Sequence, residues 1–277
     1  MLENSAMLID LTINMWTGRK MDKKISAEID IAKNTKTQAG QYHKRLLAGT
    51  KSLDNLASMA NAIRQWHYKN TLPWSDSGSR LLPMANFFDY KQQLSQLEQD
   101  FNNEVDNFLT AYPTLVQAAA FQLGNLFNND EYPDVDKLRN RFRFSYAFMP
   151  LPSAGDFRVD MEEQYRRELQ EQYEKFYQTR INDAMRDAWD RLHECLERIS
   201  MRLDGEEKQV FRDTLVTNAV EMCDMLTKLN ITNDPKLEQA RKKLESALIG
   251  VTADDLRKDK SLRKDTKARV DEILAMF

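Results

Sequence analysis

An uninterrupted helical pattern in the second half of the chain most constrains the fold. From about residue 161 to 203 the sequence contains neither proline nor glycine. Apolar residues recur there in steps of three and four, and the steps after Ile181 alternate as in coiled coils. About forty residues at 1.5 Å each predict a helix roughly 60 Å long. Such a helix needs another long helix to cover its apolar stripe, within the chain or in a partner.

The segments after this helix supply a first candidate for that cover. Gly205 is the expected stop, and an apolar pattern over residues 206–229 predicts a helix that folds back antiparallel. A further helix is expected at 235–248, followed by a charged tail with a thin apolar stripe. We therefore expect a mainly α fold, an elongated long-helix bundle or helical hairpin, with a small β element near the N-terminus.

The β element is predicted from the first twenty residues. Apolar and polar residues alternate from Ile9 to Ile13, and the run ends at Thr17-Gly18-Arg19, which is typical of a strand followed by a turn. A strand needs a neighbour to satisfy its backbone. The alternating segment 142–148 is the candidate neighbour.

The middle of the chain contains two proline-marked loops, at 72–83 and 149–158. Between them an apolar stripe predicts a helix over 84–112, which Pro113 should interrupt or kink. The Ala-rich segment 115–127 that follows is nearly apolar, so we expect a second, buried helix there.

These patterns divide the chain into four consecutive segments. They are an N-terminal strand and turn (1–20), a helical domain with the two loops and the short strand (21–160), a long antiparallel helical hairpin (161–230) and C-terminal charged helices (231–277).

Composition excludes several functional classes. Forty Lys and Arg residues nearly balance 43 Asp and Glu residues, so global positive charge gives no argument for nucleic-acid binding. No apolar run approaches the roughly 18 residues of a membrane-spanning helix. Glu3 stands where a secretory signal needs positive charge, so we expect an intracellular protein.

Residues that would carry catalysis or bind a metal are scarce. His193 and Cys195 are close in sequence, but positions i and i+2 of a helix point in different directions and cannot chelate one ion. The segment 49–52 lacks the glycine that a phosphate-binding loop places before its lysine. The acidic segment 130–136 lacks the central glycine of a calcium loop. We expect no enzyme activity, no catalytic residues, no metal and no cofactor.

Two basic segments allow a nucleic-acid interface as an alternative. Arginines and aromatic residues alternate over 139–144, which suits either phosphate binding with base stacking or a strand with solvated arginines. The charged tail is basic but interleaved with acidic residues, as on a solvated helix. The candidate residues for this alternative are Arg139, Arg141, Arg143, Lys258, Arg263 and Lys264.

Three stretches carry a family resemblance. They are Leu72-Pro73-Trp74 with Gly78-Ser79-Arg80-Leu81-Leu82-Pro83, Leu123-Gly124-Asn125-Leu126-Phe127 with Tyr132-Pro133, and Pro150-Leu151-Pro152-Ser153-Ala154-Gly155-Asp156-Phe157-Arg158. In order and spacing, nearly the whole chain resembles an uncharacterised family of mostly helical proteins from tailed bacteriophages and integrative mobile elements.

The resemblance implies a context and no catalytic residues. Members of that family tend to be encoded near a MoxR-type AAA+ ATPase and a von Willebrand factor A protein. This context implies an accessory or adaptor protein in the cytoplasm of a bacterial host, which assembles with itself or with such an ATPase. A nucleic-acid-binding factor in phage replication or recombination and a virion structural protein are the alternatives.

The proline-marked loops are the expected contact regions, because irregular loops packed on a rigid scaffold often carry binding. The partner-binding candidates in them are Trp74, Arg80, Asp156, Phe157 and Arg158.

Overall fold

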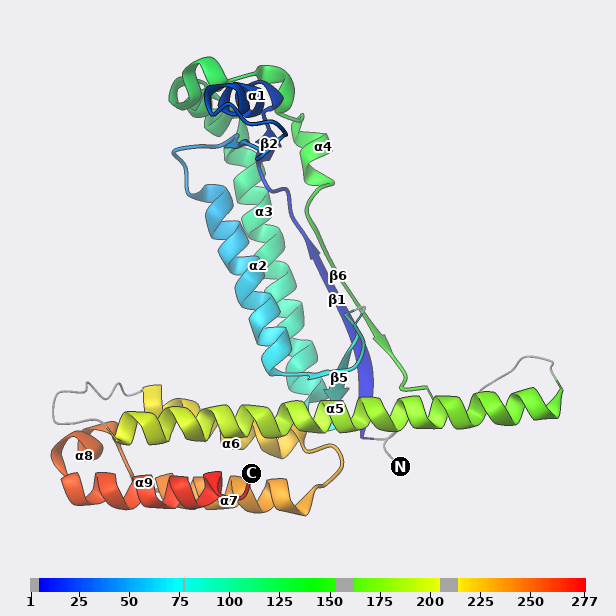
Figure 1. Ribbon diagram of the computed structural model, residues 1–277, viewed down its shortest axis with the longest axis vertical. Helices are drawn as coiled ribbons and strands as arrows, with labels where there is room; N and C mark the ends of the chain where they lie inside the picture. The colour runs from blue at the N-terminus through cyan, green and yellow to red at the C-terminus, as the bar shows by residue number, and fades with distance from the viewer. Residues whose placement is uncertain (1–4, 77, 153–161, 205–213) are drawn as a thin grey trace. The chain divides into compact units, whose positions relative to one another are not determined.

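The computed structural model describes residues 5–76, 78–152, 162–204 and 214–277, and these are mostly helical (Figure 1). The helices are α1 (Lys23–Ala32), α2 (Ser52–Lys69), α3 (Phe87–Leu123), α4 (Val135–Arg139), α5 (Glu163–Leu203), α6 (Thr214–Leu229), α7 (Pro235–Leu248), α8 (Ala253–Lys258) and α9 (Lys260–Leu274). The strands are β1 (Ala6–Asn14), β2 (Arg19–Met21), β3 (His43–Arg45), β4 (Leu72–Pro73), β5 (Arg80–Pro83) and β6 (Arg143–Met149). The mainly α class expected from the sequence is confirmed.

The chain forms two compact units, each built from separate stretches of sequence. The first unit comprises Met1–Asp10, His67–Tyr90 and Ala147–Phe277, and the second comprises Leu11–Trp66 and Lys91–Tyr146. The units therefore interleave along the chain, whereas the sequence patterns divide it into consecutive segments.

A four-stranded sheet has the order β4-β5-β1-β6. β1 and β5 are antiparallel, with Ala6 opposite Pro83 and Ile9 opposite Arg80. β6 is the neighbour of β1 that the alternation at 142–148 predicts. The loop expected at 72–83 is not wholly irregular, because β4 and β5 pair within it and Leu72 and Leu81 are fully buried.

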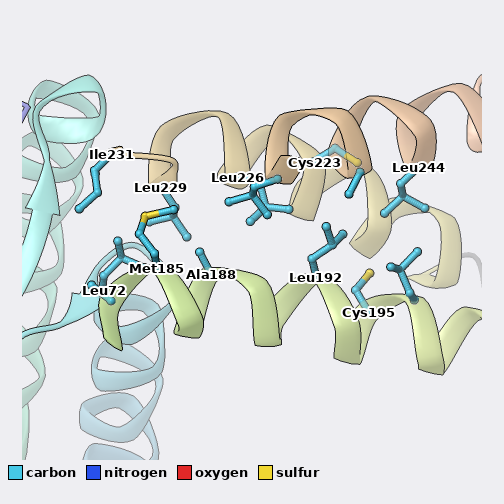
Figure 2. Close-up of a cluster of buried hydrophobic side chains, with 14 of the residues drawn as sticks. Leu72, Met185, Ala188, Leu192, Cys195, Cys223, Leu226, Leu229, Ile231 and Leu244 are labelled. Carbon is cyan, nitrogen blue, oxygen red and sulfur yellow. The ribbon is translucent and has the colours of Figure 1, made fainter. Parts of the chain in front are cut away.

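The core of the first unit lies among α5, α6, α7 and α9. α6 runs back along α5, α7 packs on α6 and α9, and α9 lies along α5, with successive helices in opposite directions (Figure 1). Figure 2 shows Met185 and Leu192 of α5 facing Leu226 and Leu229 of α6.

The sequence predicts only the α5–α6 pair, yet α9 covers a second side of the α5 stripe. Val270 and Ile273, from the thin stripe of the charged tail, are fully buried in this core. The four helices thus enclose the apolar stripe more completely than a hairpin would.

The expectations that Pro113 interrupts the helix and that the segment 115–127 is buried are both wrong. α3 continues through Pro113 as one helix, so the proline does not end it. Pro113 itself is exposed, while Leu109, whose carbonyl lacks an N–H donor at position 113, is buried. The part of α3 after Pro113 is also largely not buried, since Phe121 is 87% exposed and Ala119 is the only residue of the alanine run 118–120 that is buried.

The core of the second unit is aromatic. Trp16 meets the ring of Tyr112 edge-on, with centroids 5.9 Å apart, and Phe108 packs against Phe142 at 5.6 Å. In the segment 139–144 Phe142 is buried and the three arginines are exposed, but only Arg143 and Phe144 lie in a strand, because Arg139 ends α4.

A buried lysine joins three segments of the second unit. The Nζ atom of Lys44 lies 2.7 Å from a carboxylate oxygen of Glu131 and 3.4 Å from one of Asp22. It also donates a 2.8 Å hydrogen bond to the carbonyl of Leu126. Asp22 is the N-cap of α1, so this one ammonium group links α1, β3 and the segment 126–131.

Among the described residues, no helix contains an apolar stretch of the length that crossing a bilayer requires.

The core at α5 yields a stability prediction. Leu192 is fully buried in the first unit, so Leu192→Ala removes apolar contacts and leaves a cavity. We expect the free energy of unfolding to fall by about 3 kcal/mol. Met201→Ala, on an exposed position of the same helix, should change it by less than about 0.5 kcal/mol. Urea unfolding followed by circular dichroism measures both, and equal losses would show that the stripe is not the core.

His67 yields a pH prediction. Its ring is buried, its Nδ1 shares a 2.6 Å hydrogen bond with the hydroxyl of Tyr90, and burial together with nearby Arg80 lowers its pKa from 6.5 to about 4. Between these two values the unfolded chain binds more protons, so the free energy of unfolding falls as the pH falls. The loss at pH 4 is on the order of 3 kcal/mol.

His67→Gln should flatten this dependence between pH 6.5 and 4. Urea unfolding at several pH values measures the slope for both proteins. An unchanged slope in the variant would show that other groups cause the pH dependence.

Candidate protein-interaction site

Among the described residues, the first half of α5 leaves large apolar side chains exposed. Not one residue from Glu163 to Arg180 is buried, and the buried stripe begins at Ile181. Tyr165 is 59% exposed and Phe176 is 49% exposed. The helix here continues the apolar pattern of the bundle while lying beyond the cover of α6, α7 and α9 (Figure 1).

Both proline-marked loops reach this part of α5. The hydroxyl of Tyr173 donates a 3.1 Å hydrogen bond to the carbonyl of Pro152. The ring of Trp74 meets the ring of Tyr177 edge-on, with centroids 5.5 Å apart. Trp74 and Pro152, one from each motif, thus contact adjacent turns of one helix.

Charged side chains border these aromatic contacts. The guanidinium of Arg180 lies 5.0 Å from the centroid of the Phe176 ring and 3.5 Å from an exposed carboxylate oxygen of Asp76. Tyr, Trp and Arg are the residue types enriched in protein interfaces, because they combine a large apolar area with polar ends. We call the exposed side chains of Glu163–Arg180 the α5 face.

An arginine anchors the neighbouring elements to α5. The guanidinium of Arg191 donates hydrogen bonds to the carbonyls of Tyr68, Lys69 and Thr71, at 3.0, 2.8 and 2.9 Å. These carbonyls stand at the C-terminal end of α2, where helical hydrogen bonding runs out and a cation is favoured. The start of β4 is thereby held against α5.

Arg80 belongs to the same anchor. Its Nε donates to the hydroxyl of Thr71 at 2.7 Å, and its guanidinium lies 4.9 Å from the centroid of the Tyr68 ring. Burial lowers the pKa of Arg80, opposed by the nearby carboxylate of Asp187. Burial also disfavours the charged form of Asp187 and so raises its pKa, and the positive charges of Arg191 and Arg80 oppose this shift. The two arginines and this carboxylate therefore act as an internal polar anchor.

The partner-binding candidates from the sequence fall into two groups. Trp74 is only 7% exposed and Arg80 is bonded within the first unit, so both hold the loop against the protein. Asp156, Phe157 and Arg158 lie outside the described residues. The exposed Tyr165 and Phe176 belong to the apolar stripe that the sequence predicts. The sequence pattern does not show at which residue the other helices stop covering this stripe.

The residues predicted to bind nucleic acid lie in different units, and some of them are already paired with a carboxylate. Arg139, in the second unit, pairs with Asp106 at 2.6 Å, while Arg141 and Arg143 are exposed. In the first unit Lys258 pairs with Asp254 and Lys264 is exposed.

Arg263 has a structural role instead. It is buried, and it donates hydrogen bonds to the carbonyls of Leu256 and Arg257 near the end of α8. Its guanidinium therefore does not face a phosphate backbone.

The cysteines lie in the core. Cys195 and Cys223 are buried free thiols at the α5–α6 contact (Figure 2). Burial, together with the nearby Cys195, raises the pKa of Cys223 to about 12, so this thiol stays protonated near neutral pH. In the described part of the chain, no three His, Cys, Asp or Glu side chains come together as a metal site would require.

The geometry predicts a structural role for Trp74. We expect Trp74→Ala to lower the free energy of unfolding by about 3 kcal/mol, because the buried indole loses its contact with Tyr177. Asp76→Ala, in the same loop, removes only an exposed ion pair and should cost less than about 1 kcal/mol. Thermal and urea unfolding measure both variants. An unchanged free energy of unfolding in Trp74→Ala would show that the indole is not structural and that it is again a candidate for partner binding.

Among three comparisons with known proteins, only the scan against family models gives a match. A search of curated proteins and a search of solved structures both find no match. The family model described as a protein of unknown function, DUF3150, matches residues 3–262, which is nearly the whole chain. The chain belongs to the DUF3150 family.

Proposed function

We propose that this protein is a non-enzymatic adaptor that binds a protein partner through the α5 face. The observation that carries the proposal is the apolar row on this half-helix, in which Tyr165 and Phe176 remain exposed. In proteins most helical stability comes from burying an amphipathic face rather than from intrinsic helix propensity. A partner that covers the row would supply that burial.

The form of the surface supports a helix-mediated contact. Aromatic side chains recur at helical spacing, and charged residues such as Arg167 and Glu168 lie exposed beside them. A partner helix lying along this face would meet apolar anchors surrounded by a polar rim, as in helix-to-helix recognition.

The identity of the partner follows from the resemblance noted in the sequence. We propose two partners, a second copy of this chain and a MoxR-type AAA+ ATPase, in the bacterial cytoplasm during the life of a phage or mobile element. Self-association through the α5 face would produce the elongated, coiled-coil-like oligomer that the sequence pattern predicts. A virion structural role would use the same self-association.

Nucleic-acid binding is the less favoured function. The predicted basic residues are divided between the two units, Arg139 is engaged with Asp106, and Arg263 is buried. Arg141, Arg143 and Lys264 are the exposed cations that keep this alternative open to a direct binding test.

The proposal predicts that the double variant Tyr165→Ser with Phe176→Ser loses partner binding while remaining folded. Both side chains are exposed, so the free energy of unfolding should stay within about 1 kcal/mol of the parent. Light scattering during size-exclusion chromatography, over a range of concentrations, measures self-association. Co-elution with a purified MoxR-type ATPase measures the second partner.

Met201→Ser is the matched control. Met201 is 67% exposed on the same helix but stands at its bundle end, outside the α5 face. It should leave association unchanged. A parent protein that stays monomeric and does not bind the ATPase would overturn the proposal, as would equal association by the double variant and the control.

A further inference from the structure

A pocket in the second unit gathers three arginines. It has a volume of about 390 Å³ and lies between α2 and the segments at 15–19 and 45–50. Arg19, Arg45 and Arg64 line it, together with the single carboxylate of Asp54. Its formal charge is therefore positive, although the whole chain carries a net charge of −3. Volumes of this size are typical of small-ligand sites.

The three guanidinium groups are held to different degrees. One Nη atom of Arg45 lies 2.6 Å from each oxygen of Asp54. Arg64 donates to the carbonyl of Ile13 at 2.7 Å and to the side chain of Asn61 at 2.9 Å. Arg19 is exposed and makes no ion pair with any described residue. The fold thus holds Arg45 and Arg64 in place, whereas the guanidinium of Arg19 can pair with a ligand.

Apolar side chains line part of the pocket, and we call them the Trp16 wall. Trp16 and Leu53 contribute to it, and Trp16 is itself fixed by its edge-on contact with Tyr112. Gly18 closes this wall, because a Cβ atom there would stand 2.5 Å from a methyl carbon of Leu53, and its φ of +59° favours glycine. The chain can approach α2 this closely only with glycine at that position.

We propose that this pocket binds a small organic anion, whose carboxylate or phosphate group meets the arginines and whose flat apolar body lies against the Trp16 wall. Arginine presents its N–H donors in a planar fork that matches both anionic groups. The first turn of α2 also lines the pocket, and the positive end of that helix adds to the attraction. This site lies in the second unit, so it is independent of the α5 face in the first.

The test is titration calorimetry of the full-length protein with three probes: phenyl phosphate, benzoate and inorganic phosphate. We expect at least one of the two aromatic anions to bind more tightly than inorganic phosphate, because only they reach the apolar wall. Tighter binding by one of the two would identify which anionic group the pocket prefers.

Arg19→Gln is the diagnostic variant, and Arg143→Gln is its matched control. Both remove one exposed positive charge from the second unit, but Arg143 lies outside the pocket. We expect Arg19→Gln to weaken the aromatic anion about tenfold and Arg143→Gln to leave it unchanged. Equal affinities for the two variants would overturn the proposal. It would also be overturned if none of the probes bound, or if single-stranded DNA bound through Arg19 while the small anions did not.

Discussion

The need to cover the apolar stripe of α5 organises the first unit. From Ile181 to Leu203 the helix presents a continuous row of buried side chains, and no single helix can bury such a row by itself. α6 covers one side, α9 covers another, and α7 joins these two. The direction of each connection follows, since short links between packed helices favour antiparallel neighbours. Burial of this one stripe therefore determines how the last hundred residues fold.

Polar anchors then fix where other segments meet. Arg191 of α5 bonds three carbonyls at the end of α2, and Lys44 links α1, β3 and the segment 126–131 in the second unit. Removing Lys44 would leave two largely buried carboxylates without their cation, which costs more than the bonds contribute on average. Such groups specify register and position, whereas the apolar cores supply most of the driving force.

The two proposed sites use opposite kinds of surface. The α5 face is a row of aromatic side chains that the bundle leaves open, which suits a partner helix. The arginine pocket is a concave, positively charged hollow with one apolar wall, which suits a small anion. An adaptor with both would be able to join a protein partner through one unit and respond to a small molecule through the other.

The sequence by itself determined the long helix, because forty residues without proline or glycine and with apolar steps of three and four permit little else. It also determined the strands β1 and β6, whose alternation is a local property, and it offered β6 as the candidate neighbour that the sheet contains. It predicted a helix boundary at Pro113 that the structure does not have. It also predicted that Phe121 is buried, because apolar composition does not say whether a partner element is near. Only the tertiary structure decided that Trp74 and Arg80 face inward and that the buried part of α5 begins at Ile181. It also decided that Arg19, Arg45 and Arg64 share one pocket. These are long-range packing outcomes, and the spacing of residues along the chain does not encode which distant side chains meet.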